Sequence, residues 1–277
     1  MLLADIVLRP EAQKLVEIHT EKPTGEPRAI YVKTDVADWK QLKRVFETAD
    51  REFSAIDIVC PGAGIFEPEW SNFWHPPGTA ESKDDPFGGR YAVMDINVTH
   101  PIRTTQLAIS YFLSRTQGSE VATASPKRIV HISSTADQTA GLHAPMYFAS
   151  KHAISGFIYS LEALEPSLGI RVNGVAPGVI KTPLWTEHPE KLKYFDSTQD
   201  QWATPEEVAE AMLACVQDDD LPGGTVLEVG LGSRRKVPLH NNPGPSAAPG
   251  LVISDFSWGT QEVFEQLAGP NWRKAIV

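Results

Sequence analysis

Residues 127–134, with the sequence KRIVHISS, decide the fold predicted for this chain. Residues 127–132 predict a strand with the apolar residues Ile129, Val130 and Ile132. The nearly continuous apolar run over 56–60 predicts a strand covered on both faces, which is typical of a parallel sheet. The segments 145–164 and 170–176 then carry a helical pattern and a second buried-strand pattern. Strand, helix and strand in this order predict a β-α-β unit with parallel strands.

The same alternation extends toward the N-terminus. Residues 1–8 predict a buried strand, and Pro10 opens a predicted helix. A short strand over 29–33, a helix capped by Asp38 and a third strand over 56–60 follow.

The alternation also extends toward the C-terminus. The further predicted elements are a long surface loop over 64–89, a helix over 90–115 that Pro101 kinks or restarts, a helix over 205–216, a strand over 225–229 and a docked helix over 256–272. We therefore expect an α/β protein with a doubly wound, mostly parallel, Rossmann-like sheet between two helical layers.

Composition narrows the function classes. The 277 residues are 42% hydrophobic and 22% charged, which excludes disordered, collagen-like and coiled-coil chains. Acidic residues outnumber basic ones by 35 to 25, so we expect no nucleic-acid partner. The two cysteines, Cys60 and Cys215, each lie in an apolar run and are predicted to be small core residues.

The apolar N-terminal run is not predicted to be a targeting segment, because it contains Asp5 and no basic residue precedes it. It is also far shorter than the roughly 20 apolar residues that a membrane span requires. We expect a cytoplasmic protein with no membrane partner.

Tyr147 and Lys151 lie four residues apart near the start of a predicted helix, so their side chains leave the same face. An ammonium group close to a phenol lowers the phenol pKa from about 10, which makes tyrosine a usable general acid or base. Alone, such a pair is more typical of a solvated helix face. Ser134 favours the catalytic interpretation because it follows a strand, at the carboxyl edge where doubly wound sheets bind ligands.

Several motifs agree in order along the chain. They are Asp35-Val36, Pro61-Gly62-Ala63-Gly64, Asn97, Ser134, Tyr147 with Lys151, and Pro177-Gly178 followed by Thr182-Pro183. With them the chain resembles the short-chain dehydrogenases/reductases, in particular fungal members related to hydroxyprostaglandin dehydrogenase. The resemblance runs from about Leu2 to Val229, and we expect a Rossmann-like domain over 1–233 with an extension over 234–277 packed on it.

The resemblance implies a catalytic tetrad of Asn97, Ser134, Tyr147 and Lys151. Tyr147 would exchange a proton with the alcohol or carbonyl oxygen while hydride moves between substrate and nicotinamide. Lys151 would lower the pKa of Tyr147, Ser134 would bond the reacting oxygen, and Asn97 would hold a water beside Lys151. A helix cap at Ser134 and an amide that satisfies a helix kink at Asn97 are the structural alternatives.

The resemblance also implies a nicotinamide cofactor. Asp5, at the end of the first strand, can accept bonds from ribose hydroxyls and would repel an extra phosphate, so NAD is favoured over NADP. The histidines show no metal-ligand spacing, and no metal is expected. The remaining implied contacts are Asp35 and Val36 at the adenine, Ala63 and Gly64 at the ribose, Val179 and Thr182 at the nicotinamide carboxamide, and Tyr147 and Lys151 at the nicotinamide ribose.

The sequence departs from the family pattern in two places. The usual Asn-Asn-Ala-Gly is here Pro61-Gly62-Ala63-Gly64, and the first strand, the loop T-G-x-x-x-G-x-G and the first helix are absent. Three hypotheses follow, in order of preference. In the first, the given sequence lacks a front segment of an NAD-dependent oxidoreductase. In the second, the strands that contain Asp5 and Cys60 close up, and the site catalyses isomerisation, dehydration or cyclisation without a dinucleotide. In the third, the chain is a non-catalytic pseudoenzyme or binding module.

The expected substrate is a small apolar alcohol or ketone of secondary metabolism. Most of its pocket would come from the loop over 64–89 and the segment 182–200, which contain many Trp, Phe and Leu residues. By the same resemblance, a homodimer or homotetramer is expected.

Overall fold

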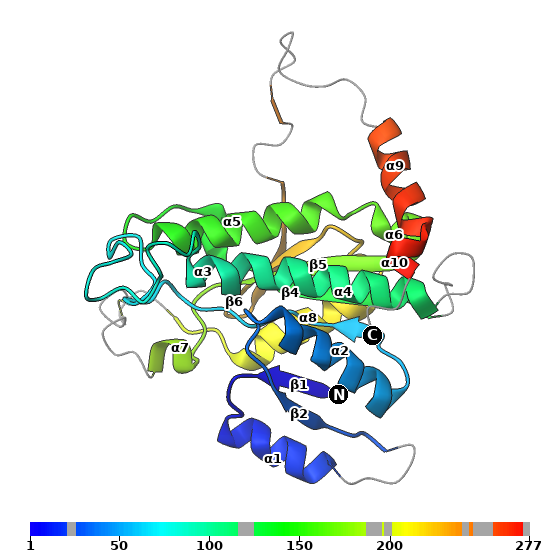
Figure 1. The fold of residues 1–277 in the computed structure, drawn as a ribbon, viewed down its shortest axis with the longest axis horizontal. Helices are drawn as coiled ribbons and strands as arrows, with labels where there is room; N and C mark the ends of the chain where they lie inside the picture. Colours follow the sequence, from blue (N-terminus) through cyan, green and yellow to red (C-terminus); the bar gives the residue numbers. More distant parts are fainter. Residues whose placement is uncertain are drawn as a thin grey trace.

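The computed structural model describes residues 1–20, 26–115, 125–186, 196, 201–239, 244–245 and 257–273 (Figure 1). The strands are β1 (Leu2–Asp5), β2 (Ile30–Lys33), β3 (Ile58–Val59), β4 (Lys127–Ile132), β5 (Ile170–Pro177), β6 (Val226–Gly230) and β7 (Ser233–Val237). The helices are α1 (Pro10–His19), α2 (Trp39–Phe53), α3 (Ala92–Met94), α4 (His100–Arg115), α5 (Pro145–Ser160), α6 (Leu164–Leu168), α7 (Pro183–Thr186), α8 (Pro205–Gln217), α9 (Ser257–Ala268) and α10 (Pro270–Arg273). Two short turns complete the set: η1 (Asp95–Thr99), a π-helical turn, and η2 (Thr135–Gln138), a 3₁₀ turn.

The main sheet contains five strands in the order β3-β4-β5-β6-β7. The first four run parallel, and β7 is antiparallel to β6. All residues of β5 except Pro177 are buried, including the polar residues Arg171 and Asn173, as expected for a central strand covered on both faces. The predicted mostly parallel sheet is confirmed, and β7 is an additional strand that begins at Ser233, where the predicted domain ends.

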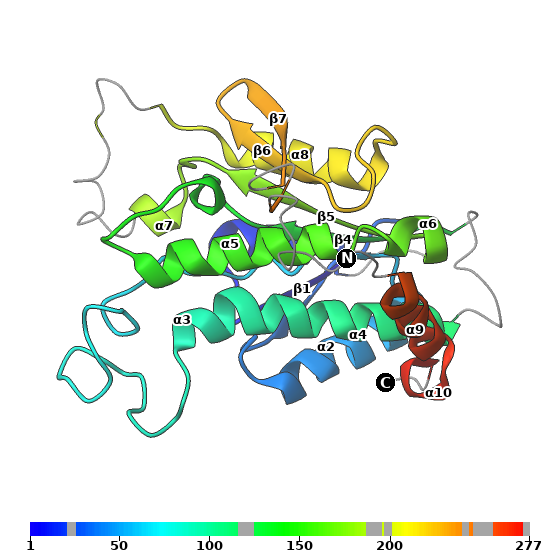
Figure 2. The ribbon, with the colours of Figure 1, turned by 90° about the horizontal axis from the view of Figure 1, so that it is seen from above.

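Helices cover both faces of the main sheet, with α4 and α5 on one side and α8 on the other (Figure 2). Neighbouring residues of β4 show why. Ile129 packs in the core cluster that contains Phe112 of α4, whereas Val130 packs in the cluster that contains Cys215 of α8. Successive strand side chains point to opposite faces, so a strand without polar alternation needs a helical layer on each side. The predicted three-layer, doubly wound fold is confirmed.

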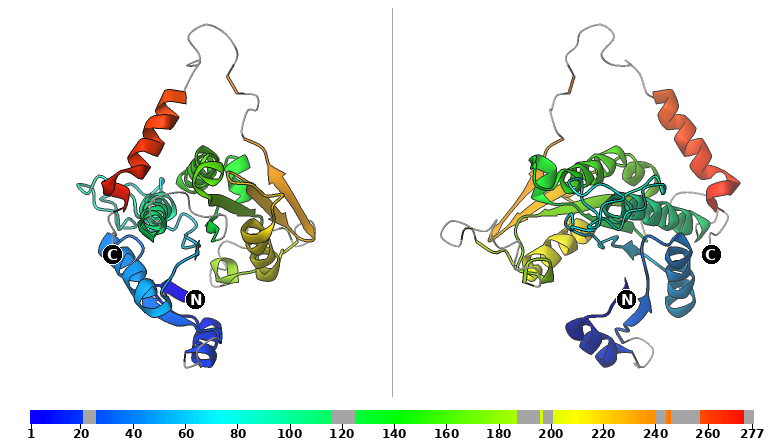
Figure 3. Two further views of the ribbon diagram at one scale, coloured as in Figure 1. Left: turned by 90° about the vertical axis from the view of Figure 1, so that its right-hand side faces the viewer. Right: turned by 60° about the vertical axis from the view of Figure 1, so that its left-hand side comes forward.

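A separate two-stranded sheet is formed by β1 and β2, which run parallel and lie apart from the main sheet (Figure 3). Within the described part of the chain, β1 and β3 each have a hydrogen-bonded strand on one edge only. The strands with Asp5 and Cys60 therefore do not close up. The prediction of a buried strand over 1–8 is also wrong, because Ile6 and Val7 are each 61% exposed. Among the described strands β1 pairs only with β2 and lies outside the five-stranded sheet, so this segment is not enclosed as its apolar pattern predicts.

The long helical pattern over 90–115 forms α3, η1 and α4 in succession. Helix α4 begins at His100, directly before Pro101 and directly after the π-helical turn η1, so the change of helical bonding falls where the proline lacks an N–H. The π-helical turn immediately precedes it and contains Asn97. Such turns widen a helix locally, which re-aims the side chains that they carry.

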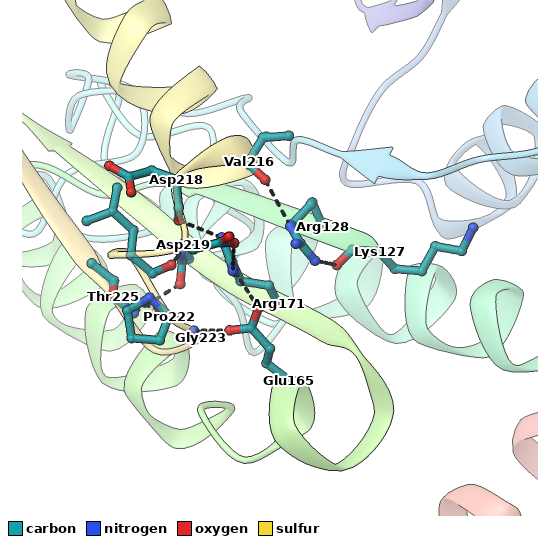
Figure 4. A network of polar contacts seen from close by, with 12 residues as sticks. Lys127, Arg128, Glu165, Arg171, Val216, Asp218, Asp219, Pro222, Gly223 and Thr225 are labelled. Atoms are coloured by element: carbon teal, nitrogen blue, oxygen red, sulfur yellow. Dashed lines mark hydrogen bonds and ion pairs between the residues drawn. The ribbon is translucent and has the colours of Figure 1, made fainter. Parts of the chain in front are cut away.

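A network of buried charge anchors the edge of the sheet where β4 and β5 begin (Figure 4). The Arg171 side chain bonds the Glu165 carboxylate (Nε to Oε1, 2.5 Å) and the backbone carbonyl of Asp218 (2.8 Å). Glu165 also accepts a bond from the amide of Gly223 at 2.6 Å, so its other oxygen is satisfied. Arg128 donates to the carbonyl of Val216 at 3.0 Å. These contacts tie α6 and the end of α8 to the strands at the edge opposite Ser134.

The described C-terminal helices α9 and α10 pack against α4. The Ser110 hydroxyl of α4 donates to the carbonyl of Trp272 at 3.0 Å, and Leu267 of α9 is buried in the same core cluster as α4. Residue 256, the start of the predicted helix, lies outside the described residues.

The two cysteines differ in environment. Cys215 lies on the core-facing side of α8 and is buried, as predicted, but Cys60 is exposed. The prediction for Cys60 fails because it follows β3, whose second edge carries no strand in the described chain. No helix among the described residues is long and apolar enough to cross a membrane.

Candidate active site

Ser134 lies just past the carboxyl end of β4 and caps the turn η2. Its hydroxyl accepts a bond from the amide of Ala136 at 3.2 Å and lies 3.4 Å from the carbonyl of Pro177. The capping alternative for this serine is therefore real. It does not exclude chemistry, because Ser134 lines the same cavity as Tyr147.

Tyr147 and Lys151 occupy the first two turns of α5 and meet Ser134 at this edge of the sheet. The Lys151 ammonium lies 5.6 Å from the centroid of the Tyr147 ring and donates to the carbonyl of Ile132 at 3.0 Å. Its side chain is almost fully buried. The spacing thus brings a phenol, a hydroxyl and an ammonium group together.

The pKa shifts follow from this burial. Burial lowers the pKa of Lys151 from 10.5 to about 8, and the nearby negative charge of Asp137 opposes that shift. Burial raises the pKa of Tyr147, which the hydrogen bond with Ser134 counteracts and the charge of Asp137 reinforces. The expected lowering of the Tyr147 pKa by Lys151 is therefore not observed, because desolvation of the phenolate is the larger effect. At neutral pH Tyr147 is a neutral hydroxyl.

Asn97 braces the site from the π-helical turn. Its side chain accepts from the amide of Ile65 (2.9 Å) and donates to the carbonyl of Ile65 (2.8 Å) and to the Ser150 hydroxyl (3.1 Å). A side chain at Gly64 would begin only 3.5 Å from the Asn97 carbonyl oxygen and 3.7 Å from the Lys151 ammonium. Asn97 therefore fixes the chain after β3 against α5 and brings the backbone of Gly64 close to Lys151.

The side chains of Ser134, Tyr147 and Lys151 border a cavity of about 280 Å³, and Asn97 is not among the described residues that line it. Five of the predicted site residues line it: Gly64, Ser134, Tyr147, Lys151 and Thr182. The other described lining residues are Gly62, Ile65, Phe66, Ile132, Ser133, Pro177, Gly178, Ile180, Leu184, Trp185, Pro205 and Val208. Most of these are apolar. Nearly all of the segment 187–200, predicted to form part of the pocket, lies outside the described residues.

The other predicted cofactor contacts lie away from this cavity. The exposed Asp5 side chain ends β1, where it lies 3.4 Å from the amide of Val7. Asp35 accepts from the amide of Ala37 at 2.9 Å, in the loop after β2. Val36 packs against the core cluster. Ala63 is exposed, and the carbonyl of Val179 accepts from the amide of Ala203 at 3.0 Å.

Sequence inspection missed a buried carboxylate beside the tetrad. Asp137, in η2, is fully buried and accepts hydrogen bonds from the hydroxyls of Ser155 and Ser133, the latter at 3.2 Å. Ser133 also contacts the carbonyl of Lys151 at 3.3 Å. The sequence feature that could have indicated this carboxylate is Ser155, which lies one helical turn after Lys151 on the helix face that contacts Ser133.

Replacing Lys151 with methionine tests the burial of its ammonium group. Between pH 8 and 10.5 the unfolded chain binds more protons at Lys151 than the folded protein does, so wild-type stability rises with pH in this window. The unfolding free energy of Lys151→Met relative to wild type should therefore fall as the pH increases. Urea unfolding at about pH 7, 9 and 10 measures this difference. A difference that does not change with pH would contradict the burial.

Lys151, Tyr147 and the backbone of Gly64 converge on one cavity, with hydroxyl and ammonium groups facing it. A cradle for the two phosphates is not formed by the described residues at the start of α1. The cap of α1 is Arg9, without a capping side-chain bond, and no glycine precedes that helix.

The family profile of the short chain dehydrogenases matches residues 4–193. The chain therefore belongs to the short-chain dehydrogenase family, whose members are oxidoreductases that use nicotinamide cofactors. The family prediction is confirmed.

Individual relatives agree with this assignment. The 15-hydroxyprostaglandin dehydrogenase [NAD(+)] of Rattus norvegicus is 28% identical over 211 residues, covering 71% of this chain and 69% of its own. A short-chain dehydrogenase/reductase of Penicillium rubens is 28% identical over 185 residues, covering 65% of this chain and 51% of its own. The crystal structure of a 3-ketoacyl-(acyl-carrier-protein) reductase from Brucella melitensis, complexed with NADH, superposes with a TM-score of 0.62 at 23% identity, covering 82% of this chain and 85% of that one. The last likeness concerns the fold.

Proposed function

We propose that this protein is an NAD-dependent oxidoreductase that interconverts a secondary alcohol and a ketone on a small apolar substrate. The observation that supports this most is the convergence of Ser134, Tyr147 and Lys151 on one cavity. The rat relative named for NAD(+) supports the choice of cofactor class.

The bound dinucleotide would accept or supply hydride. Tyr147 exchanges a proton with the substrate oxygen, and its raised pKa keeps it protonated at neutral pH, ready to donate to a ketone. Ser134 orients that oxygen through its hydroxyl. The Lys151 ammonium holds ribose hydroxyls and stabilises the tyrosinate that proton donation leaves behind. Asn97 keeps the Gly64 backbone beside Lys151 through its bonds to Ile65.

The cavity lining supports an apolar substrate. Of the described residues around it, Lys151 is the charged one, and the remainder include Phe66, Leu184 and Trp185. A substrate carboxylate or ammonium would lose its hydration there without a further ion partner. A neutral hydroxy or keto compound with an apolar body fits this lining.

Cofactor titration tests the proposal and the role of Asp5. Trp185 lines the cavity, so NADH binding should change tryptophan fluorescence. We expect a dissociation constant for NADH below about 100 μM, about 5.5 kcal/mol of affinity, and weaker binding of NADPH. Asp5→Asn should bring the dissociation constants of NADH and NADPH closer together, because the carboxylate that repels a ribose phosphate is removed. Failure of this chain to bind either dinucleotide would refute the proposed oxidoreductase activity for it.

One observation favours a second candidate function. The side chains of Ser134, Tyr147 and Lys151 line one cavity, and proton transfer by such groups requires no dinucleotide. The alternative is proton-transfer catalysis by Ser134, Tyr147 and Lys151 without a dinucleotide, as in an isomerase, dehydratase or cyclase. It would be supported by Tyr147-dependent turnover in a protein that does not bind NADH.

A further inference from the structure

Helix α5, which carries Tyr147, begins without a capping side chain of its own. The residue at its cap is Ala144, which offers no side-chain acceptor, and Pro145 has no N–H at the next position. The first amide bonded within the helix is that of Phe148, which donates to the carbonyl of Ala144 at 3.1 Å. The amide of Tyr147 therefore requires an acceptor from elsewhere in the chain.

Glu67 supplies that acceptor from 80 positions earlier in the sequence. Its carboxylate Oε2 accepts from the Tyr147 amide at 3.0 Å, and Oε1 accepts from the amide of Phe73 at 2.8 Å. The Glu67 residue is only 5% exposed. A buried carboxylate must be compensated, and two backbone amides with the positive end of a helix dipole provide that compensation.

The same loop also holds the Tyr147 ring. The ring centroids of Phe66 and Tyr147 lie 4.7 Å apart, and the indole of Trp74 donates to the carbonyl of Leu142 at 2.7 Å, just before α5. Consecutive residues 66 and 67 thus contact the ring and the amide of one tyrosine. The irregular segment after β3 therefore contacts the first turn of α5 through Phe66 and Glu67, and the residues just before α5 through Trp74.

We propose that Glu67 is a positioning residue for Tyr147: its carboxylate caps α5 across the fold and fixes where the tyrosine hydroxyl stands in the cavity. For catalysis this inference rests on the proposed function. Ile65 and Phe66 line the cavity on the same loop, so Glu67 joins the substrate-facing loop and the proton-carrying helix into one rigid unit. Small displacements of a reacting group reduce rates strongly, which gives such a cap a kinetic consequence.

The test compares Glu67→Gln with Glu69→Gln in the full chain. Glu67→Gln keeps the size of the side chain but places an NH₂ group against one of the two amides that the carboxylate accepts. Glu69 lies two residues away on the same loop and is exposed, so it is the matched control. Two measurements are made: hydrogen exchange at the amides of the first turn of α5, and the separate values of kcat and KM.

In Glu67→Gln we expect exchange at the Tyr147 amide to accelerate by about tenfold, the effect of losing one helix cap. We expect kcat to fall on the order of tenfold or more, with the substrate KM changed by less than about threefold. Glu69→Gln should match wild type in both measurements. If Glu67→Gln does not fold, Glu67→Asp, which keeps the charge but shortens the reach, should show the same changes at smaller size.

Exchange at Tyr147 that equals wild type in the folded Glu67 variant would overturn the proposal. So would a loss of activity expressed in KM alone. Absence of dinucleotide-dependent turnover in the wild-type protein would instead refute the proposed function. Hydrogen exchange needs no substrate or cofactor, so it still decides whether Glu67 fixes Tyr147.

Discussion

Tyr147→Phe will reduce the rate of alcohol-ketone interconversion by about 10²- to 10⁴-fold, the usual contribution of a positioned acid or base. The substitution removes a single oxygen from the cavity that Tyr147 lines together with Ser134, and leaves the ring in contact with Phe66. We therefore expect kcat to collapse while NADH affinity and thermal stability stay close to those of wild type. Steady-state kinetics measure kcat, and the fluorescence titration measures the affinity for NADH.

Tyr159→Phe is the matched control for this substitution. Tyr159 lies on the same helix, and its hydroxyl donates to the carbonyl of Val237 at 3.1 Å, away from the cavity. Removing that hydroxyl should change stability slightly and leave kcat within about threefold of wild type. Unchanged activity in Tyr147→Phe would refute Tyr147 as the proton carrier.

Phe112→Ala will lower the free energy of unfolding by about 3 to 5 kcal/mol, because a fully buried ring is replaced by a cavity. Phe112 lies in α4 and packs in the core cluster with Ile129 and Val172, the residues that join α4 to the sheet. A loss of this size is a large part of the stability of a typical domain. Urea unfolding of the variant and of wild type gives the difference.

Phe87→Ala is the matched control, because it makes the same substitution at an exposed position. Phe87 is 95% exposed, so its loss should alter the unfolding free energy by less than about 0.5 kcal/mol. If the two variants were equally stable, α4 would not be packed against the sheet as described.

The alternation of strands and helices was predictable because it is local. The strand pattern over 127–132 and the helical spacing that follows it are properties of short windows, and both form as predicted. The convergence of Ser134 with Tyr147 and Lys151 was also predictable, since a strand end and the start of the next helix meet at the carboxyl edge of a parallel sheet.

Predictions that depended on neighbours from distant parts of the chain failed. Cys60 and residues 1–8 have apolar surroundings in the sequence, but burial depends on which strands lie beside β1 and β3. The direction of the Tyr147 pKa shift was also wrong, because the desolvation of the phenol depends on all elements around it. Glu67 has no sequence signal for its contact with Tyr147, since loop residues far from a helix carry no helical period.

The sequence by itself determined the fold class, the order of the elements and the hydroxyl and ammonium side chains that line the cavity. These features were predictable because side-chain periodicity and short spacings are set by backbone geometry. The tertiary structure alone decided three matters: the separation of β1 and β2 from the main sheet, the ionisation of Tyr147 and Lys151, and the capping of α5 by Glu67. Each depends on atoms brought together from distant positions, where burial and hydrogen bonding act through space and leave no local pattern.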